Sequence, residues 1–262
     1  MPKLEPIFEH VHKVNLIEEE IAASIAQRLA LKKDMPNYMR AYMKLNDHTI
    51  MLQKRAAKLN ERIIIRSRKI VALPASHRGS LPIIGEIPPQ LHAKIDRSRE
   101  IVEMYVHRNL LPKTAFERIL PYENPYNQYD IAHFNEVHDP EMAAHEIVHN
   151  IETQHPAVLQ KSRDFLMLRS AGEEPIKLKD SNFQNAHTYS DDDRAVEDEW
   201  ESLGGRLYTG RYYSLPGKLD IQDAVSTELL TEGICRLHKN PALFAATDPE
   251  YFSFVLNTLR NL

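Results

Sequence analysis

The segment His145-Glu146-Ile147-Val148-His149 carries the side chains in this chain that are best suited to chemistry. Two histidines four residues apart on a helix project from one face, so both imidazoles can bind one Zn²⁺ at ~2.0–2.1 Å. Glu146 lies beside them, where a carboxylate can hold and deprotonate an attacking water. This spacing predicts a zinc-dependent hydrolase with Glu146 as its general base. Since HExxH arises by chance in about one comparable chain in twenty, the residues around the motif must decide between this interpretation and two ordinary surface histidines.

The residues before the motif predict the start of a helix and a sheet next to it. Asp139 can cap free amides, Pro140 suits the first helical position, and Glu141 opposes the positive end of the helix dipole. Further upstream, residues 116–122 and 129–136 read as two strands of an antiparallel pair, separated by a turn-rich segment. We expect the second strand to lie at a sheet edge, where it would bind an extended peptide substrate by strand addition.

A catalytic zinc takes three protein ligands and a water, so a third ligand must follow the motif. His155 reproduces the outer spacing of HExxHxxGxxH, but Glu152 stands where that pattern needs a glycine. In a continuing helix His155 would lie about 80° off the line of His145. Pro156 instead indicates that His155 caps a second helix. His155 is therefore the less favoured third ligand.

The segment AVSTELLTEGICRLH, residues 224–238, offers the alternative. Its pattern predicts an amphipathic helix with Glu228 and Glu232 on one apolar face. Two carboxylates on such a face need partners, and a metal ion is one. We prefer Glu228 as the third ligand and expect Glu232 to support a ligand histidine. The alternative interpretation is a pair that faces solvent.

Three further polar side chains lie in LYTGRYYS, residues 207–214, namely Tyr208, Arg211 and Tyr213. A phenol or a guanidinium at this place could stabilise the oxyanion of a tetrahedral intermediate. The alternative is strand packing for the tyrosines and solvent exposure for the arginine. We include all three as candidate catalytic residues.

From about residue 130 to residue 262 the chain resembles the zincin-like metallopeptidase domain of bacteriophage and prophage proteins. The resemblance is carried in matching order by HEIVHNIE, the run from HPAVLQ to KLKD, LYTGRYYS, STELLTEG and DPEYFSFVLNTLR. It implies a zinc metallopeptidase with a gluzincin-like ligand set of His145, His149 and Glu228. It disfavours His155, whose counterpart is usually Asn, and it departs at Glu232, where the family has an apolar residue.

The elements that position these residues are expected to be mainly helical. Residues 16–71 contain two amphipathic helices with a break near 34–36, which predicts an antiparallel helical hairpin. Residues 72–92 hold four prolines and two glycines, which indicates a linker or a wrapping loop. We expect an α+β, predominantly helical chain with a small antiparallel sheet. Its parts are a helical N-terminal region over 1–71, a linker over 72–94 and the zincin-like domain over 95–262.

Composition and charge limit the classes of partner. The net charge is −4, from 33 Lys and Arg against 37 Asp and Glu, so the chain as a whole gives no reason to expect nucleic acid or an anionic membrane. A single cysteine cannot form an internal disulfide or a thiolate zinc cluster, so a bound metal needs His and carboxylate ligands. We expect a protein or peptide substrate.

The N-terminus lacks the apolar region of a signal peptide, and no apolar run approaches the roughly 18 residues of a membrane span. We therefore expect a chain in the bacterial cytoplasm or in a virion, or an effector that leaves by a non-classical route. Two alternatives to a general peptidase stay open here: a phage structural or assembly protein with an incidental zincin fold, and a bacterial effector or toxin protease. In each case the N-terminal helices would contact the phage particle or the effector target.

Overall fold

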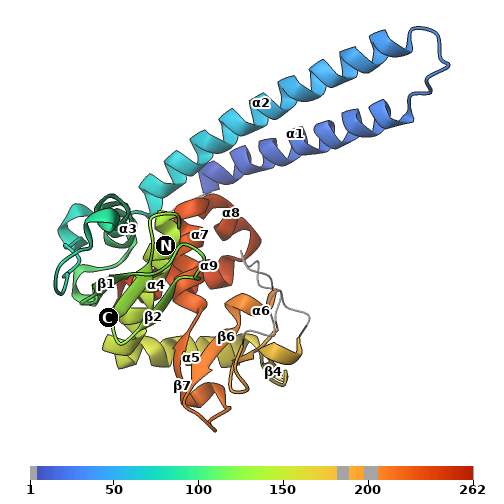
Figure 1. Cartoon of the computed structure of the whole chain (residues 1–262). Helices are drawn as coiled ribbons and strands as arrows, with labels where there is room; N and C mark the ends of the chain where they lie inside the picture. Colours follow the sequence, from blue (N-terminus) through green and yellow to red (C-terminus); the bar gives the residue numbers. More distant parts are fainter. Residues whose placement is uncertain (1–4, 182–188, 198–205, 262) are drawn as a thin grey trace. The chain divides into compact units, whose positions relative to one another are not determined.

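A computed structural model describes residues 5–181, 189–197 and 206–261 (Figure 1). The chain divides into two compact units. The first consists of residues 1–71 with 240–246, and the second of residues 72–239 with 247–262. Within the described residues, no helix has both the length and the apolar character that crossing a bilayer requires.

The first unit is built on a hairpin of α1 (Glu5–Ala30) and α2 (Tyr38–Val71), joined by α8 (Pro241–Thr247). Its apolar seam contains Ile17, Leu52 and Ala56. Near the turn, Ser24 Oγ lies 2.9 Å from Thr49 Oγ1. The pairing of early α1 residues with late α2 residues makes the helices antiparallel, as the sequence predicts. The first helix begins earlier than expected because the buried stripe extends back through Val14 and Ile7.

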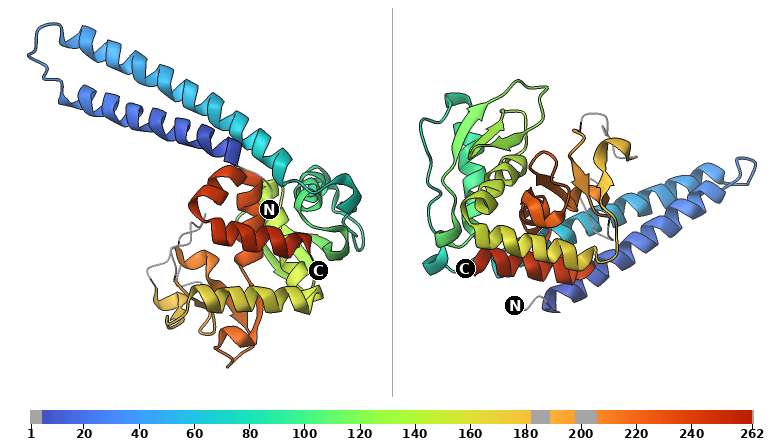
Figure 2. Two further views of the ribbon diagram at one scale, coloured as in Figure 1. Left: turned by 180° about the vertical axis from the view of Figure 1, so that it is seen from behind. Right: turned by 90° about the horizontal axis from the view of Figure 1, so that it is seen from below.

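The second unit is arranged around the helix that carries the HExxH motif. This helix, α4 (Pro140–Gln154), packs against helices and against a three-stranded sheet (Figures 1 and 2). Ten consecutive residues, Ala143–Glu152, are buried. Because buried polar groups need hydrogen-bond or charge partners, the polar side chains of this helix require partners from other elements. The other helices of the unit are α3 (His92–Tyr105), α5 (Pro156–Arg169), α6 (Arg206–Thr209), α7 (Leu229–Lys239) and α9 (Pro249–Arg260).

The sheet beside α4 has the order β1-β3-β2, with β1 at Ala115–Arg118, β2 at Tyr126–Gln128 and β3 at Ile131–Phe134. The expected antiparallel pairing is wrong, because β1 and β3 run parallel. The antiparallel partner of β3 is β2, which lies in the segment predicted as a turn. The strand expected at the sheet edge, β3, is therefore the central strand.

The tight turn of this sheet lies at residue types that do not predict a turn. Tyr129 and Asp130 connect β2 to β3, and both have positive φ, 53° and 64°. Two residues with positive φ form the type I′ hairpin turn, for which Asn-Gly or Asp-Gly is the usual signal. A tyrosine in this conformation gives no such signal, so the turn was predicted several residues too early.

A second sheet has the order β4-β5-β6-β7, with each neighbouring pair antiparallel. Its strands are β4 (Ile176–Lys177), β5 (Arg194–Ala195), β6 (Arg211–Ser214) and β7 (Ala224–Thr227). The prediction of one continuous helix over 224–238 is wrong, because residues 224–227 form β7 and α7 begins only at Leu229. Glu228 lies at the junction. Its amide donates to Arg211 O at 3.0 Å, and its carbonyl accepts from the Glu232 amide at 3.0 Å.

Residues 72–94, expected as a linker, belong to the second unit and wrap around it. The Leu81 amide donates to Glu103 Oε1 on α3 at 2.7 Å, and Ile83 forms a parallel bridge with Thr114 before β1. Before α3 begins at His92, the helical structure of this segment consists of two short 3-10 turns, at Ala75–His77 and Pro89–Leu91, because the prolines interrupt longer helices. The chain as a whole is mostly helical with small sheets, as predicted, but the sheet beside α4 is mixed and not antiparallel.

We expect Gly233→Ala to destabilise the second unit. A Cβ at position 233 on α7 would clash with Val255 Cγ2 on α9, because the two atoms would be closer than packed atoms approach. Forcing an added methyl into a packed core costs about 1–3 kcal/mol, measurable as a lower urea midpoint. Val255→Ala makes room for that methyl, so the double variant should lose less stability than the two single variants added together. Strict additivity would contradict the close contact between α7 and α9.

Candidate functional site

The helix that carries the motif begins as predicted but is capped differently. Pro140 occupies the first turn, and Glu141 faces the positive end of the helix dipole. The side chain of Asp139 makes no capping hydrogen bond, so its expected role is wrong. The Asp139 carbonyl instead accepts the Met142 amide at 3.0 Å.

The three motif residues lie together inside the second unit. His145, Glu146 and His149 are buried, and one potential ligand atom from each lies within 4.8 Å of the others. The two imidazole rings have centroids 5.1 Å apart and are nearly perpendicular, at 79°. This buried cluster could hold a metal ion.

Glu228 completes this cluster from the junction of β7 and α7. Its Oε2 lies 3.0 Å from His145 Nε2 and 3.6 Å from His149 Nε2, and its side chain is fully buried. Ligand atoms at ~2.0–2.1 Å from a tetrahedral zinc are about 3.3–3.4 Å apart. The two distances from Glu228 Oε2 to the histidine nitrogens bracket that value, so Glu228 could share one metal ion with each histidine.

His155 lies outside the cluster of potential metal ligands in the described residues. It ends α4 and precedes α5, and its carbonyl accepts the Val158 amide at 2.8 Å. The second helix begins at Pro156, as the sequence predicts. His155 therefore acts as a junction residue between two helices.

The Glu228 carboxylate is held by two hydroxyl groups. Tyr213 donates a short hydrogen bond to Glu228 Oε1, and Thr231 Oγ1 donates to Oε2 at 2.8 Å. Burial, followed by the charge of Glu228, raises the pKa of Tyr213 well above its ordinary value, so its hydroxyl stays protonated and donates. Both hydroxyls fix the orientation of the carboxylate toward the histidines.

His149 is oriented by a relay that the sequence analysis missed. Its Nδ1 lies 3.1 Å from Ser226 Oγ, which in turn donates to Glu152 Oε2 at 3.1 Å. Glu152 also accepts from the Thr227 amide at 2.6 Å and from Thr227 Oγ1 at 2.7 Å. The available signal was the position of Glu152, three residues after His149 and thus next to it on the helix surface.

The second nitrogen of His145 faces the other glutamate of the later segment. Glu232 Oε1 lies 3.9 Å from His145 Nδ1, which is a charge contact and too long for a hydrogen bond. Glu232 is buried, so the alternative that this pair of glutamates faces solvent is wrong. The structure thus brings both glutamates to His145, one at each ring nitrogen.

The three candidate oxyanion residues occupy different places. Tyr213 is engaged by Glu228, as described above. Arg211 lies over the ring of Tyr213, 4.3 Å from its centroid, and its Nη2 is 3.6 Å from Asp193 Oδ1. Tyr208 lies beside His145, with ring centroids 6.3 Å apart. Burial, together with Glu228, raises the pKa of Tyr208, so its phenol is a hydrogen-bond donor at neutral pH.

Burial shifts the protonation of the cluster. It raises the pKa of Glu146 to about 7 and lowers the pKa of His149 to about 4. His149 is therefore neutral near pH 7, the form in which imidazole binds metals. Burial opposes charge on His145, but Tyr208 and Glu228 raise its pKa well above the ordinary value. Burial likewise opposes ionisation of Glu228, but His149 and His145 lower its pKa.

No family model, curated protein or solved structure matches the chain. The resemblance to the phage-associated zincin-like domain therefore stays a prediction. What bears on function is the geometry of the buried cluster and of the residues that hold it.

We expect Glu152→Gln to weaken zinc binding by roughly 10–100-fold, the usual range for a residue that orients a ligand. A neutral amide is a weaker acceptor for Ser226, so His149 becomes a poorer metal ligand. The measurement is a zinc dissociation constant from competition with a chromogenic chelator. Glu141→Gln, on the partly exposed first turn of the same helix, is the control and should bind zinc as the wild type does. Equal affinities of the two variants would contradict the relay.

Proposed function

We propose that this protein is a zinc-dependent peptidase. The observation that carries the proposal is the approach of Glu228 Oε2 to the Nε2 atoms of His145 and His149, at 3.0 and 3.6 Å. Two imidazole nitrogens and one carboxylate oxygen are a donor set typical of catalytic zinc, which would leave a fourth position for water. Bound zinc would lower the pKa of that water toward ~7 and polarise the substrate carbonyl.

Glu146 is the general base in this proposal. It is buried beside the histidines, and a pKa of about 7 lets its carboxylate accept a proton and return it at neutral pH. Glu146 removes a proton from the attacking water, whose oxygen forms the new bond to the peptide carbon. As the carbon–nitrogen bond breaks, Glu146 delivers that proton to the leaving amine.

Tyr208 is the best placed of the three candidates to donate a hydrogen bond to the developing oxyanion. It neighbours His145, and its raised pKa keeps the phenol protonated. Tyr213 and Arg211 have other tasks in this proposal, because Tyr213 holds Glu228 and Arg211 packs on the ring of Tyr213. Both act by positioning the glutamate.

The strand order moves the proposed substrate edge from β3 to β2. Within the described residues β2 pairs only with β3, so it is an edge strand. On the other side of the sheet, Ile83 forms a parallel bridge with Thr114, the residue before β1. Asn127, in the middle of β2, donates from Nδ2 to Glu146 O at 2.9 Å, which ties this edge to the motif. An extended peptide added to β2 would therefore run beside the general base.

The test is metal analysis of the protein purified without chelators, followed by incubation with a proteome-derived peptide library. We expect about one zinc per chain and new peptide termini that disappear when a chelator is added and return with zinc. A protein without bound metal that also fails to take up added zinc would overturn the proposal. Zinc binding without any cleavage would support the proposed metal centre but refute the proposed peptidase activity.

A further inference from the structure

The charge of the chain is divided between its two units. Residues 1–71 carry 14 Lys and Arg against 8 Asp and Glu, a net charge of +6, and the segment 240–246 adds none. Because the whole chain has a net charge of −4, the rest of the chain has a net charge of −10. The net charge of the whole chain, which predicts no anionic partner, conceals a basic first unit.

Most of the positive charge of the first unit lies along one face of α2. With 100° of rotation per residue, eight cations fall within an arc of about 120°. We call this arc the basic face; it consists of Arg40, Lys44, Lys54, Arg55, Lys58, Arg62, Arg66 and Lys69. All eight are exposed, and none forms a salt bridge within the described part of the chain. One acidic residue, Asp47, lies in the same arc.

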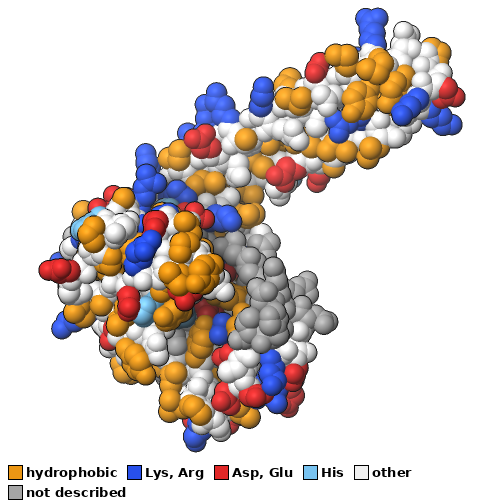
Figure 3. Space-filling view, in the orientation of Figure 1, with side chains coloured by type: hydrophobic (Ala, Val, Ile, Leu, Met, Phe, Trp, Pro, Cys, Tyr) orange, Lys and Arg blue, Asp and Glu red, His pale blue; other side chains and the backbone are white. Residues whose placement is uncertain are grey.

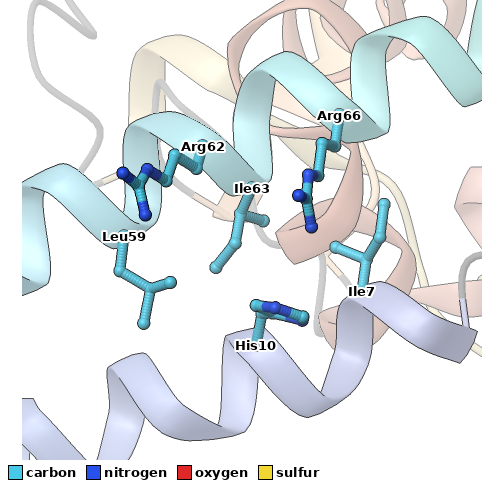
Figure 4. Close-up of a pocket in the computed structure, with 6 residues that line it drawn as sticks. All are labelled: Ile7, His10, Leu59, Arg62, Ile63 and Arg66. Atoms are coloured by element: carbon cyan, nitrogen blue, oxygen red, sulfur yellow. The ribbon is translucent and has the colours of Figure 1, made fainter.

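The border of the basic face toward α1 is a groove between the two helices. Figure 4 shows Arg62 and Arg66 from α2 above His10 of α1, with apolar side chains between the helices. The floor contains Ile7 and Ile63, which are buried. Cations over an apolar floor, without a carboxylate among the lining residues, suit an anionic group attached to apolar material.

Large apolar side chains are exposed next to the basic face. Met39 is 62% exposed, Met43 58%, Met51 54%, Ile65 47% and Ile50 41%. Figure 3 shows apolar and basic side chains side by side on the visible face of this hairpin. Phosphates of a nucleic acid would leave these apolar groups in water or beside charge, whereas a lipid surface accepts both kinds of side chain.

We propose that the basic face of α2 and its neighbouring methionines dock the protein on an anionic lipid bilayer. The cations face the lipid phosphates, and the exposed apolar side chains enter the boundary between headgroups and acyl chains. This docking is peripheral and does not depend on the proposed metal centre.

The test is flotation of the whole 262-residue chain with vesicles. We expect binding to phosphatidylcholine vesicles that contain 30 mol% phosphatidylglycerol, binding lost in ~0.5 M NaCl because salt screens the charges, and none to pure phosphatidylcholine. Lys54→Gln with Lys58→Gln should lower the partition coefficient by roughly 30-fold, at about fivefold for each cation near the surface. The matched control is Lys113→Gln with Lys218→Gln, exposed lysines of the second unit, and should bind like the wild type.

Two further measurements separate this proposal from its rivals. Met39→Gln with Met43→Gln should weaken vesicle binding while circular dichroism stays unchanged, and full binding would refute apolar insertion. Duplex DNA should fail to displace the protein from anionic vesicles. Displacement by DNA, equal loss in the control variant, or no binding to anionic vesicles would overturn the lipid surface as the partner.

Discussion

Glu146→Gln should reduce peptide cleavage by at least about 100-fold while zinc stays bound, because general-base catalysis contributes about 10²–10⁴ to the rate. The amide keeps the size of the side chain but cannot accept a proton from water. The Glu146 backbone carbonyl, which accepts from Asn127, is unchanged, so the link between α4 and β2 should survive. The loss should appear in kcat with little change in KM, as expected when an interaction specific to the transition state is removed.

The matched control is Glu141→Gln, which changes the same chemical group on the first turn of the same helix. Its cleavage rate should equal that of the wild type. Zinc content and thermal midpoint of all three proteins should be measured in parallel, so that a lost rate cannot be attributed to lost metal. A Glu146→Gln protein that cleaves at the wild-type rate would exclude Glu146 as the base.

Glu228→Ala should have the second large effect, this time on the metal centre itself. We expect zinc affinity to fall by more than the roughly 10–100-fold typical of residues that only orient a ligand. The variant also leaves His145 without its buried countercharge, and the hydroxyls of Tyr213 and Thr231 without their acceptor. Breaking a buried charge pair from one side costs about 3–5 kcal/mol, so the unfolding midpoint should drop as well.

Glu228→Gln serves as the milder variant if the alanine protein does not fold. It keeps the volume and one acceptor oxygen, and it should still bind zinc more weakly than the wild type. His155→Asn is the comparison for the third ligand, and its zinc affinity should be unchanged. A loss of zinc from the His155 variant with retention in both Glu228 variants would show that the two residues have exchanged roles.

Local features of the site could be predicted from the sequence because they depend on a few neighbouring residues. Four-residue spacing places His145 and His149 on one helix face whatever surrounds them. Proline at the first helical position locates the starts of α4 and α5 at Pro140 and Pro156. The N-terminal hairpin follows from periodicity alone.

Strand pairing could not be predicted in the same way. The antiparallel pairing of β2 with β3 depends on a turn formed by Tyr129 and Asp130, whose positive φ values have no strong sequence signal. The helical pattern over 224–238 failed for a related reason. The Tyr212 and Thr227 backbones pair across β6 and β7, and this contact overrides the local preference of the segment.

The sequence by itself determined which side chains could act: two histidines in register, a glutamate beside them, and two later glutamates of which one was preferred as a ligand. Only the tertiary structure decided how they meet. Packing of α4 against β7 and α7 brings Glu228 to both imidazoles and sets Glu152 behind His149 through Ser226. Such contacts join residues far apart in the chain, so they depend on how buried surfaces fit together, and no periodicity within one segment encodes that fit.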